Sequence, residues 1–256
     1  QPYLDQMAST CRASDDGYGL SRVNSIVRLI DYMPWDSKFF GKEIYNLNTK
    51  SYTPSIKNKI DAVIEQKETN LIYFLCPSSN LSSIDFALKD GFECVDERLT
   101  YLVTKVEFNS AVLDRKYCIK RSTHQDITRL QFIAAKSRWT TRYYNDKKFP
   151  KDRLQKFYSE WVKKSVSGEL DDMVFHIEEA GTIFGFVTIK KNGSNLGSIG
   201  LIAVVKEAQG KGFGIKLAAH AVNTLINDLG CAAVEVVTQK NNTPACKTYE
   251  RLGFKV

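Results

Sequence analysis

Residues 196–229 read LGSIGLIAVV, KEAQGKGFG and IKLAAHAVNTLINDL in succession. The first ten residues are apolar and predict a buried strand. Apolar side chains recur at helical spacing from Ile215 to Leu229, and Gly230 follows where a helix is expected to end. The loop between strand and helix contains the glycines Gly210, Gly212 and Gly214. Glycines before a helix let backbone amides approach an anion closely, so the loop predicts a phosphate or pyrophosphate site.

The glycine spacing excludes two common nucleotide-binding motifs. A dinucleotide fingerprint needs a third glycine three residues after the second, and Ile215 stands at that position. A P-loop needs Ser or Thr directly after Gly-Lys, but Gly212 follows Lys211. The loop is therefore expected to bind a phosphate-bearing ligand by a motif other than the dinucleotide fingerprint or the P-loop.

The segments around this loop predict a mixed fold. Residues 173–179 and 182–190 alternate like strands, and Ala180-Gly181 and Asn192-Gly193 mark hairpin turns between them and the strand that begins at residue 196. Further expected elements are two strands, near residues 117–123 and 231–239, and two helices, over 124–137 and 241–253. A complete α/β (α+β) unit is therefore expected to start near Arg115, with a mostly antiparallel sheet flanked by helices.

The pattern Q-x-x-G-x-G, followed by helix, strand, asparagine and Y-E-R-L-G-F, resembles the GNAT superfamily of acetyl-CoA-dependent N-acyltransferases. Here the motif residues are Gln209, Gly212 and Gly214, and the resemblance covers about residues 115–256. It implies the GNAT fold and acetyl-CoA as co-substrate, with no metal. It also implies that loop amides hold the coenzyme A pyrophosphate and that the preceding strand runs beside the pantetheine. The implied coenzyme-binding residues are Ile202, Val204, Gln209, Gly210, Lys211, Gly212, Phe213, Gly214 and Asn242.

The same resemblance implies that Tyr249 is catalytic. Tyr249 lies seven residues after Asn242, two turns along one helix face. Attack of an amine on a thioester expels a thiolate, and a phenol with a pKa near 10 can protonate it while staying neutral at pH 7. Backbone amides at the end of the 201–205 strand could stabilise the oxyanion. The general base stays open between Glu178, Glu179, His176 and water relays.

The first half of the chain contains a degraded copy of this pattern. Leu71–Phe92 aligns with Ala233–Phe254, which superimposes Asn80 on Asn242. Ala87 stands at the tyrosine position, and residues 47–52 (LNTKSY) replace the glycine loop. The expected domains are thus residues 1–114, a partial GNAT-like domain that shapes the acceptor site without binding coenzyme, and residues 115–256, the catalytic domain.

The two copies end differently. After Gly91-Phe92 the first continues through residues 93–106, which predict a strand pair, whereas the second stops at Val256. Either the sequence ends early or the final strand of the second copy is supplied in another way.

Two stretches narrow the resemblance further. Residues 35–41 (WDSKFFG) and 158–168 (YSEWVKKSVSG) are similar to dTDP-fucosamine acetyltransferases and their relatives. This implies an acceptor of the dTDP-4-amino-4,6-dideoxy-hexose type, acetylated by direct transfer for surface polysaccharide. Taken alone, the aromatic residues of 35–41 are most simply core. Alternatives are another amine, on a protein or a small molecule, and an acyl-CoA-binding protein without catalysis.

The net charge of +7 is concentrated in one stretch. Residues 136–165 contain ten basic residues and three acidic ones, which accounts for the whole excess. Leu154, Phe157, Tyr158 and Trp161 recur there at helical spacing, so a solvated helix face explains the pattern. A wall facing an anionic acceptor, such as a nucleotide sugar, explains it equally. Nucleic acid is disfavoured because no nucleic-acid-binding motif accompanies the charge.

Composition sets the remaining expectations. A chain of 256 residues with 43% hydrophobic and 25% charged residues is ordinary for a globular protein, and its apolar runs are too short to span a bilayer. Six scattered cysteines without a C-x-x-C pair predict reduced thiols and a cytoplasmic location. No membrane partner is expected, and the sequence leaves open whether the protein forms a homodimer.

Overall fold

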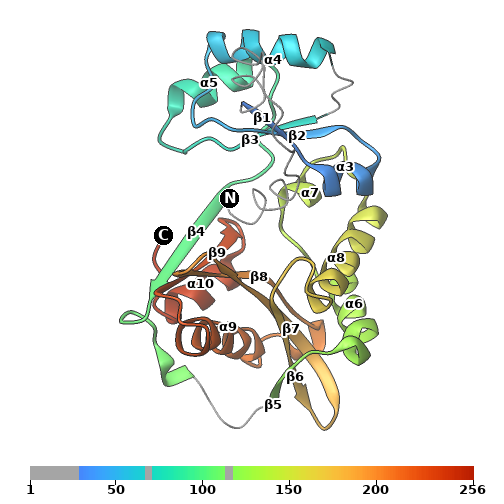
Figure 1. Cartoon of the computed structure of the whole chain (residues 1–256), viewed down its shortest axis with the longest axis vertical. Coiled ribbons are helices and arrows are strands. Elements are labelled where there is room, and N and C mark those ends of the chain that lie inside the picture. The colour runs from blue at the N-terminus through green and yellow to red at the C-terminus, as the bar shows by residue number, and fades with distance from the viewer. Residues whose placement is uncertain (1–28, 67–70, 113–117) are drawn as a thin grey trace, which may run out of the picture. The chain divides into compact units, whose positions relative to one another are not determined.

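The computed structural model describes residues 29–66, 71–112 and 118–256 (Figure 1). Two compact units make up the chain, residues 1–94 and 95–256. Across the described ranges, every helix is too short or too polar to cross a bilayer. Cys11 lies outside these ranges, and the other five cysteines are free thiols.

In the first unit, a small sheet has the strand order β1-β2-β3. Strand β2 pairs antiparallel with β1 and parallel with β3. Two helices follow the pattern of the sequence repeat, α4 between β2 and β3 and α5 after β3. The elements are β1 (Ile30–Tyr32), α3 (Pro34–Phe40), β2 (Ile44–Leu47), α4 (Pro54–Gln66), β3 (Leu71–Phe74) and α5 (Leu81–Lys89).

The second unit is built on a larger mixed sheet. Within the described residues it has six strands in the order β4-β9-β8-β7-β6-β5. All neighbouring pairs are antiparallel except β8 with β9. The strands are β4 (Arg98–Thr104), β5 (Cys118–Arg121), β6 (Met173–Glu179), β7 (Thr182–Asn192), β8 (Leu196–Val204) and β9 (Ala233–Gln239). The three consecutive strands predicted from residues 173 to 205 are therefore confirmed.

Helices cover both faces of this sheet (Figure 1). On one face lie α6 and α8, and on the other α9 and α10. The helices are α6 (Ile127–Lys136), α7 (Arg142–Asn145), α8 (Lys151–Val166), α9 (Phe213–Asn223) and α10 (Thr243–Arg251), with a π-helical turn η4 (Thr224–Asp228) and short 3-10 turns η1 (Ser110–Val112), η2 (His124–Asp126) and η3 (Lys206–Ala208). The mixed sheet flanked by helices agrees with the predicted fold class.

The core of the second unit lies between the sheet and α9. Leu217, Ala218, Ala221 and Leu225 on the apolar side of α9 and its π-helical extension are fully buried. Gly197 of β8 lies under this helix, where an added Cβ would stand 2.8 Å from a methyl carbon of Leu225. Close contact between helix and sheet thus fixes where α9 begins, and with it the position of the glycine loop.

The two units share one topology. In each, an antiparallel strand pair is followed by a helix, a parallel strand and a second helix: β1-β2-α4-β3-α5 in the first, where α3 connects β1 to β2, and β7-β8-α9-β9-α10 in the second. Asn80 and Asn242 both stand at the N-cap of the last helix. The aligned segments of the sequence repeat therefore occupy equivalent elements.

Strand β4 follows the first copy in sequence but belongs to the second sheet. All its residues, from Arg98 to Thr104, pair antiparallel with β9. Lys255 pairs with Leu102 through two backbone hydrogen bonds of 2.7 and 2.8 Å, so the residues after α10 also join β4. The boundary between the units therefore lies after Cys94, about twenty residues earlier than the repeat suggests, and β4 supplies the strand beside β9.

Candidate active site

Strands β8 and β9 diverge in the middle of the sheet. They pair only from Leu196–Ala233 to Ile199–Val236, although β8 continues to Val204 and β9 to Gln239. Each keeps its outer neighbour beyond that point, β8 with β7 and β9 with β4. The facing edges of the two strands are therefore left unpaired and border a slot in the sheet, which we call the splay.

A β-bulge in β8 coincides with this divergence. Two residues of β8, Gly200 and Leu201, stand opposite one residue of β7, Thr188. The Leu201 amide donates to Thr188 Oγ1 at 2.9 Å instead of to a backbone carbonyl. Bulges bend the strand that contains the extra residue. This bulge therefore turns β8 at the residue where its pairing with β9 stops.

The strand geometry leaves backbone groups available inside the splay. Both Leu201 and Val205 direct their amides toward β7, Val205 by a hydrogen bond of 2.8 Å to the Phe184 carbonyl. Backbone groups of successive strand residues face opposite sides. The amides of Ile202 and Val204 consequently face the splay. These are two of the positions predicted to contact the pantetheine.

The glycine loop lies at the end of β8 and at the N-terminus of α9. Gly210 and Gly212 have φ angles of 78° and 82°, which explains why glycine is needed there. Gly214 has an ordinary φ, and a Cβ added to it would meet no atom within 4 Å. Among the described residues, the amides of all three glycines donate no hydrogen bond. The loop therefore presents open amides and empty space at a helix N-terminus, which suits a phosphate.

Other predicted coenzyme-binding residues border this loop. The Gln209 side chain donates to the Val204 carbonyl at 3.2 Å, which ties the loop to the end of β8. Lys211 is exposed, so its charge is available to an anion at the loop. Phe213 is only 3% exposed and its ring packs on Phe184, so only its backbone can serve a ligand.

Helix α10 carries the remaining two predicted residues. Asn242 begins the helix and donates from Nδ2 to Thr238 Oγ1 near the end of β9, at 3.1 Å. Tyr249 is buried, and its ring packs against Tyr101 of β4 and Phe254, at centroid distances of 5.8 and 5.6 Å. Helix α10 also contacts α9. The catalytic tyrosine predicted from the sequence thus sits in an aromatic setting to which β4 contributes.

Burial controls the protonation of this tyrosine. Burial, and to a lesser degree the neighbouring Cys246, raises the pKa of Tyr249 well above its ordinary value near 10. The Tyr101 hydroxyl donates to Glu250 Oε1 at 3.1 Å, and burial together with bonds to Cys246 and Glu250 raises its pKa as well. Both phenols are therefore neutral at physiological pH and available as proton donors.

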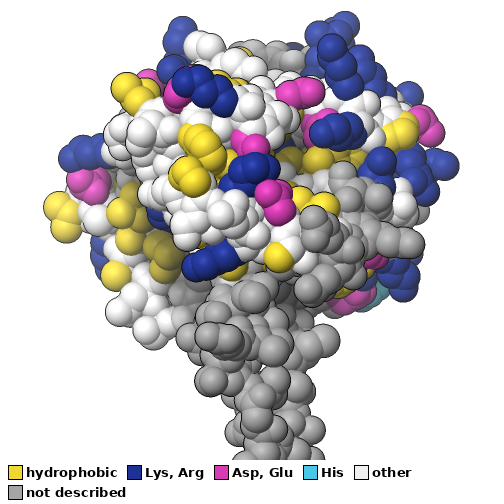
Figure 2. Space-filling view, turned by 90° about the horizontal axis from the view of Figure 1, so that it is seen from above, with side chains coloured by type: hydrophobic (Ala, Val, Ile, Leu, Met, Phe, Trp, Pro, Cys, Tyr) yellow, Lys and Arg dark blue, Asp and Glu magenta, His cyan; other side chains and the backbone are white. Residues whose placement is uncertain are grey.

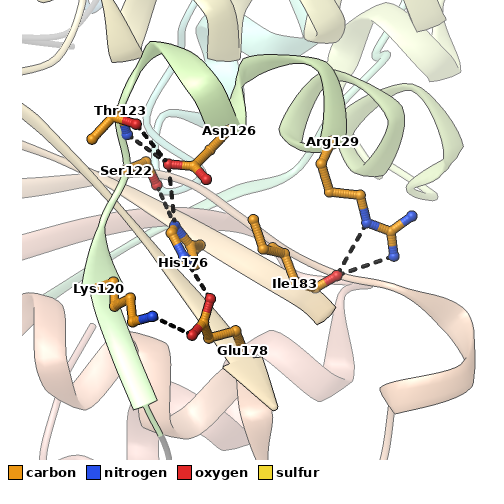
Figure 3. Close-up of polar contacts among 8 residues, drawn as sticks. All are labelled: Lys120, Ser122, Thr123, Asp126, Arg129, His176, Glu178 and Ile183. Atoms are coloured by element: carbon orange, nitrogen blue, oxygen red, sulfur yellow. Dashed lines mark hydrogen bonds and ion pairs between the residues drawn. The ribbon is translucent and has the colours of Figure 1, made fainter. Parts of the chain in front are cut away.

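The general-base candidates on β6 form a separate network (Figure 3). His176 is buried, with Nδ1 3.0 Å from Ser122 Oγ and Nε2 3.5 Å from Glu178. Lys120 pairs with Glu178 and, as the largest cause, lowers the pKa of that carboxyl. Strand β7 stands between β6 and β8. This network joins β5 to β6, and Glu179 is exposed at the end of β6.

The first unit differs from the second at the equivalent loop. Strands β2 and β3 pair along all four residues of each, and both strands end there. The Tyr52 amide donates to Ser83 Oγ at 3.0 Å, and Asn80 Nδ2 donates to the Lys50 carbonyl at 3.1 Å. The side chains of Ser83 and Asn80 therefore contact the loop that corresponds to the glycine loop.

The basic stretch 136–165 forms α7, α8 and the loops before them. Three of its aromatic rings lie nearly parallel: Trp139 stacks on Tyr158 at 4.4 Å and 13°, and Tyr158 lies 6.2 Å from Trp161 at 5°. The helix face predicted from Leu154, Phe157 and Tyr158 is buried. Figure 2 shows the molecule from above, over the end where α4 and α5 lie in Figure 1, and there the side chains that are not grey mix Lys and Arg with acidic and hydrophobic ones.

Sequence reasoning did not single out three of these residues. Thr188, Tyr101 and Asp171 belong to no motif, and their hydrogen-bond partners are Leu201, Glu250 and Ser165, which lie 13, 149 and 6 positions away. A hydroxyl within the apolar run of β7 was the one local signal for Thr188. Within the described ranges, no three potential metal ligands lie close enough together to hold an ion.

Comparison with known proteins agrees with this geometry. Residues 133–254 match the acetyltransferase (GNAT) family. A mycothiol acetyltransferase from Mycolicibacterium gilvum (strain PYR-GCK) is 35% identical over 83 residues, which are 31% of this chain and 27% of that protein. The match therefore spans little more than a quarter of the length of this curated relative.

Two solved structures resemble nearly the whole chain. A conserved protein of unknown function from Staphylococcus epidermidis ATCC 12228 is 16% identical, covers 98% of this chain and 92% of its own, and has a TM-score of 0.60. A GCN5-related N-acetyltransferase from Kribbella flavida is 10% identical, with coverage of 92% and 89% and a TM-score of 0.59. At these identities the likeness concerns the fold alone. Residues 133–254 are thus similar to the GNAT acetyltransferase family, and the splayed sheet and the glycine loop agree with that similarity.

Proposed function

We propose that this protein is an N-acetyltransferase that uses acetyl-CoA as its acetyl donor. The observation that carries the proposal is the splay between β8 and β9, which opens beside a loop with unpaired glycine amides. The amides of Gly210, Gly212 and Gly214 would hold the pyrophosphate, and Ile202 and Val204 would bond the pantetheine. When bound, acetyl-CoA supplies a thioester whose acetyl group an amine can accept.

The chain's own residues would contribute positioning and one proton. Tyr249, a phenol that is neutral at pH 7, donates its proton to the thiolate that leaves, and the proton that the attacking amine loses passes to a base or to water. Most of the rate would come from holding the amine and the thioester together, so transfer is direct, without an acetylated enzyme. The first unit would bind no coenzyme, since its loop is occupied by Asn80 and Ser83. Its role would be to shape the acceptor site.

For the acceptor we favour an amine on a nucleotide-linked sugar of the dTDP-4-amino-4,6-dideoxy-hexose type, made for surface polysaccharide. The basic stretch 136–165 with its aromatic stack of Trp139, Tyr158 and Trp161 supports an anionic acceptor that has a flat base. The similarity of residues 35–41 and 158–168 to that enzyme class points the same way. We infer a cytoplasmic location, where such nucleotide-linked sugars and acetyl-CoA would both be available.

A second acceptor class is favoured by the curated relatives. These are named mycothiol acetyltransferases, and they match about 30% of this chain. An acceptor related to mycothiol would also accept the acetyl group through an amine at the splay. The two classes differ in charge, because a nucleotide sugar brings a diphosphate and would depend on the basic stretch.

The experiment is acetyl transfer with a panel of acceptors, followed by mass spectrometry of every product. The panel holds nucleotide amino sugars, mycothiol-type amines, peptides with free N-termini or lysines, and small amines. Acetylation of the nucleotide amino sugars alone supports the favoured class, and acetylation only of the other groups rejects it. A protein that binds acetyl-CoA in calorimetry but acetylates nothing would instead be an acyl-CoA-binding protein.

A further inference from the structure

An arginine of α6 is bonded to strand β7. Arg129, in the first turn of α6, donates from both Nε and Nη2 to the Ile183 carbonyl, at 3.2 and 3.0 Å (Figure 3). The guanidinium also lies over the Phe132 ring of the same helix, 5.4 Å from its centroid. Two hydrogen bonds from one guanidinium edge fix the direction of a contact as well as its distance. Helix α6 is therefore attached to β7 at one defined carbonyl.

This carbonyl stands next to a second bulge of the sheet. Ile177 of β6 is opposite Gly185 of β7, but the following residue of β6, Glu178, is opposite Ile183. Phe184 is therefore an extra residue in β7, and we call this irregularity the Phe184 bulge. A bulge interrupts the regular ladder of a strand pair, so contacts from outside the ladder can fix its position. The guanidinium contact falls on the residue directly before this bulge.

Phe184 contacts both ends of the glycine loop. Its carbonyl accepts the Val205 amide, just before the loop, at 2.8 Å. Its ring packs on the ring of Phe213, the first residue of α9, at a centroid distance of 5.6 Å. Strands β7 and β8 approach closely beside it, since a Cβ added to Gly185 would stand 2.6 Å from the Ala203 carbonyl oxygen. A displacement of the Phe184 bulge would thus be passed to Val205 and Phe213 together.

The start of α6 has a second contact with the sheet. Asp126, directly before the helix, accepts hydrogen bonds from the Thr123 amide and hydroxyl at 2.8 and 3.1 Å, and its Oδ2 lies 4.0 Å from His176 Nδ1 of β6. Asp126 thus places the helix start next to β6, while Arg129 reaches β7 (Figure 3). Helix α6 therefore supports the Phe184 bulge from the face of the sheet opposite α9 (Figure 1).

We propose that Arg129 is a positioning residue for acetyl-CoA: it holds the Phe184 bulge, which sets the place of both ends of the glycine loop. The inference rests on the proposed function for its effect on coenzyme binding, whereas the contacts from α6 to the loop do not depend on that function. Arg129 acts through Ile183 and Phe184 rather than by contact with the coenzyme. Loop amides that are in place before binding lose less freedom on binding, so the affinity is higher.

The first test measures acetyl-CoA binding and steady-state kinetics in Arg129→Met, which removes every donor but keeps an unbranched side chain. Affinity measured by calorimetry should fall about tenfold and the KM for acetyl-CoA should rise by a similar factor. Because the pyrophosphate is remote from the reacting acetyl group, kcat should stay within about twofold.

The matched control is Arg121→Met, at an exposed position of β5. It removes the same charge and should change neither the affinity nor the KM. Unchanged affinity in folded Arg129→Met, or an equal fall in the two variants, overturns the proposal.

Arg129→Lys separates charge from geometry. Lysine keeps the positive charge but replaces the two-donor edge by a single ammonium. It should therefore recover only part of the affinity, to within about threefold of the wild type. Full recovery by lysine would assign the effect to charge alone and would overturn the positioning role.

Hydrogen exchange followed by NMR examines the support of the loop and needs no coenzyme. The Val205 amide should exchange about tenfold faster in Arg129→Met than in the wild type, while amides of the β4–β9 ladder should keep their rates. An unchanged Val205 rate, or equal acceleration throughout the sheet, overturns the proposal. Arg129→Lys serves for the same measurement if Arg129→Met does not fold. Wild-type protein that binds no acetyl-CoA but shows this exchange pattern would reject the proposed function and leave the support of the loop by Arg129 in place.

Discussion

The ring of Tyr101 lies 5.8 Å from the ring of Tyr249, centroid to centroid, although the two residues come from a strand that follows the first unit and from the last helix. Tyr101 is 2% exposed and its hydroxyl is bonded to Glu250, the residue after Tyr249. Strand β4 therefore does more than complete a sheet. It helps to bury the phenol that we propose as the acid, and burial raises the pKa of that phenol.

Replacing Tyr249 by phenylalanine should remove the proton donor and keep the packing. We expect kcat to fall roughly 100-fold, because general acid catalysis commonly contributes at least that much. Acetyl-CoA affinity, measured by calorimetry, should stay within about twofold, as no binding contact is assigned to the hydroxyl. The control is Tyr32→Phe, which makes the same change at an exposed position of the first unit. Full activity of Tyr249→Phe would exclude Tyr249 as the acid.

Gly214→Ala should separate coenzyme binding from folding. The φ of Gly214 is ordinary and a Cβ meets nothing within 4 Å, so the melting temperature should hardly change. If coenzyme phosphates occupy that space, acetyl-CoA affinity should fall about tenfold, which corresponds to about 1.4 kcal/mol. Gly193→Ala is the matched control, since its φ of 64° predicts a loss of stability of about 1 kcal/mol without loss of affinity. Unaltered affinity in Gly214→Ala would mean that the loop does not approach the coenzyme.

The closed loop of the first unit predicts a binding stoichiometry. Calorimetry with acetyl-CoA should give one site per chain, because in the equivalent loop of the first unit the Tyr52 amide donates to Ser83 and Asn80 donates to the Lys50 carbonyl. Adding Ser83→Ala should leave that number unchanged while costing about 1 kcal/mol of stability, since the buried Tyr52 amide loses its acceptor. Two sites in the wild type would contradict the assignment of the first copy as inactive.

Buried Asp171 should also make stability depend on pH. Its pKa is about 7 in the folded chain and near 4 when unfolded, so the unfolded chain releases its proton first as pH rises. The stabilising contribution is thus complete below pH 4 and is lost as pH rises through 7. Denaturant titrations should show Asp171→Asn gaining up to roughly 4 kcal/mol relative to the wild type between pH 4 and pH 8. A difference between the two proteins that does not vary with pH would show that Asp171 does not titrate in this way.

The position of β4 predicts where the chain can be shortened. A fragment that starts at residue 95 keeps the strand beside β9, but one that starts at residue 115 loses it together with Tyr101. We expect the shorter fragment to aggregate, because the whole length of β9 then becomes an open edge. Size-exclusion chromatography and circular dichroism of the two fragments would check this. If both fragments were equally folded and monomeric, the boundary between the two units would lie near residue 115, as the sequence repeat predicts.

Motifs formed by residues close together in the sequence could be predicted, whereas features that depend on which strands pair could not. The loop from Gln209 to Gly214 and the helix with Asn242 and Tyr249 were recognisable because their spacing along the chain encodes their geometry. The splay was not, because it depends on which residues of β8 and β9 stop pairing. Glu178 and His176 are base candidates by residue type, and their contacts with Lys120 and Ser122 could not be predicted from spacing along the chain. Strand β4 was assigned to the first copy because only the β4–β9 register places it in the second sheet.

The origin of β4 also has a consequence for the order of folding. The Tyr101 hydroxyl donates a hydrogen bond to Glu250, which lies 149 positions later in the sequence, and β4 pairs with β9 along its whole length. Contacts between such distant residues form slowly, and on the ribosome they cannot form before the later partner has been synthesised. Strand β4 therefore has no partner strand until β9 has been synthesised. The surroundings of Tyr249 are therefore completed only after β9 and α10 have been synthesised, long after Tyr101 itself.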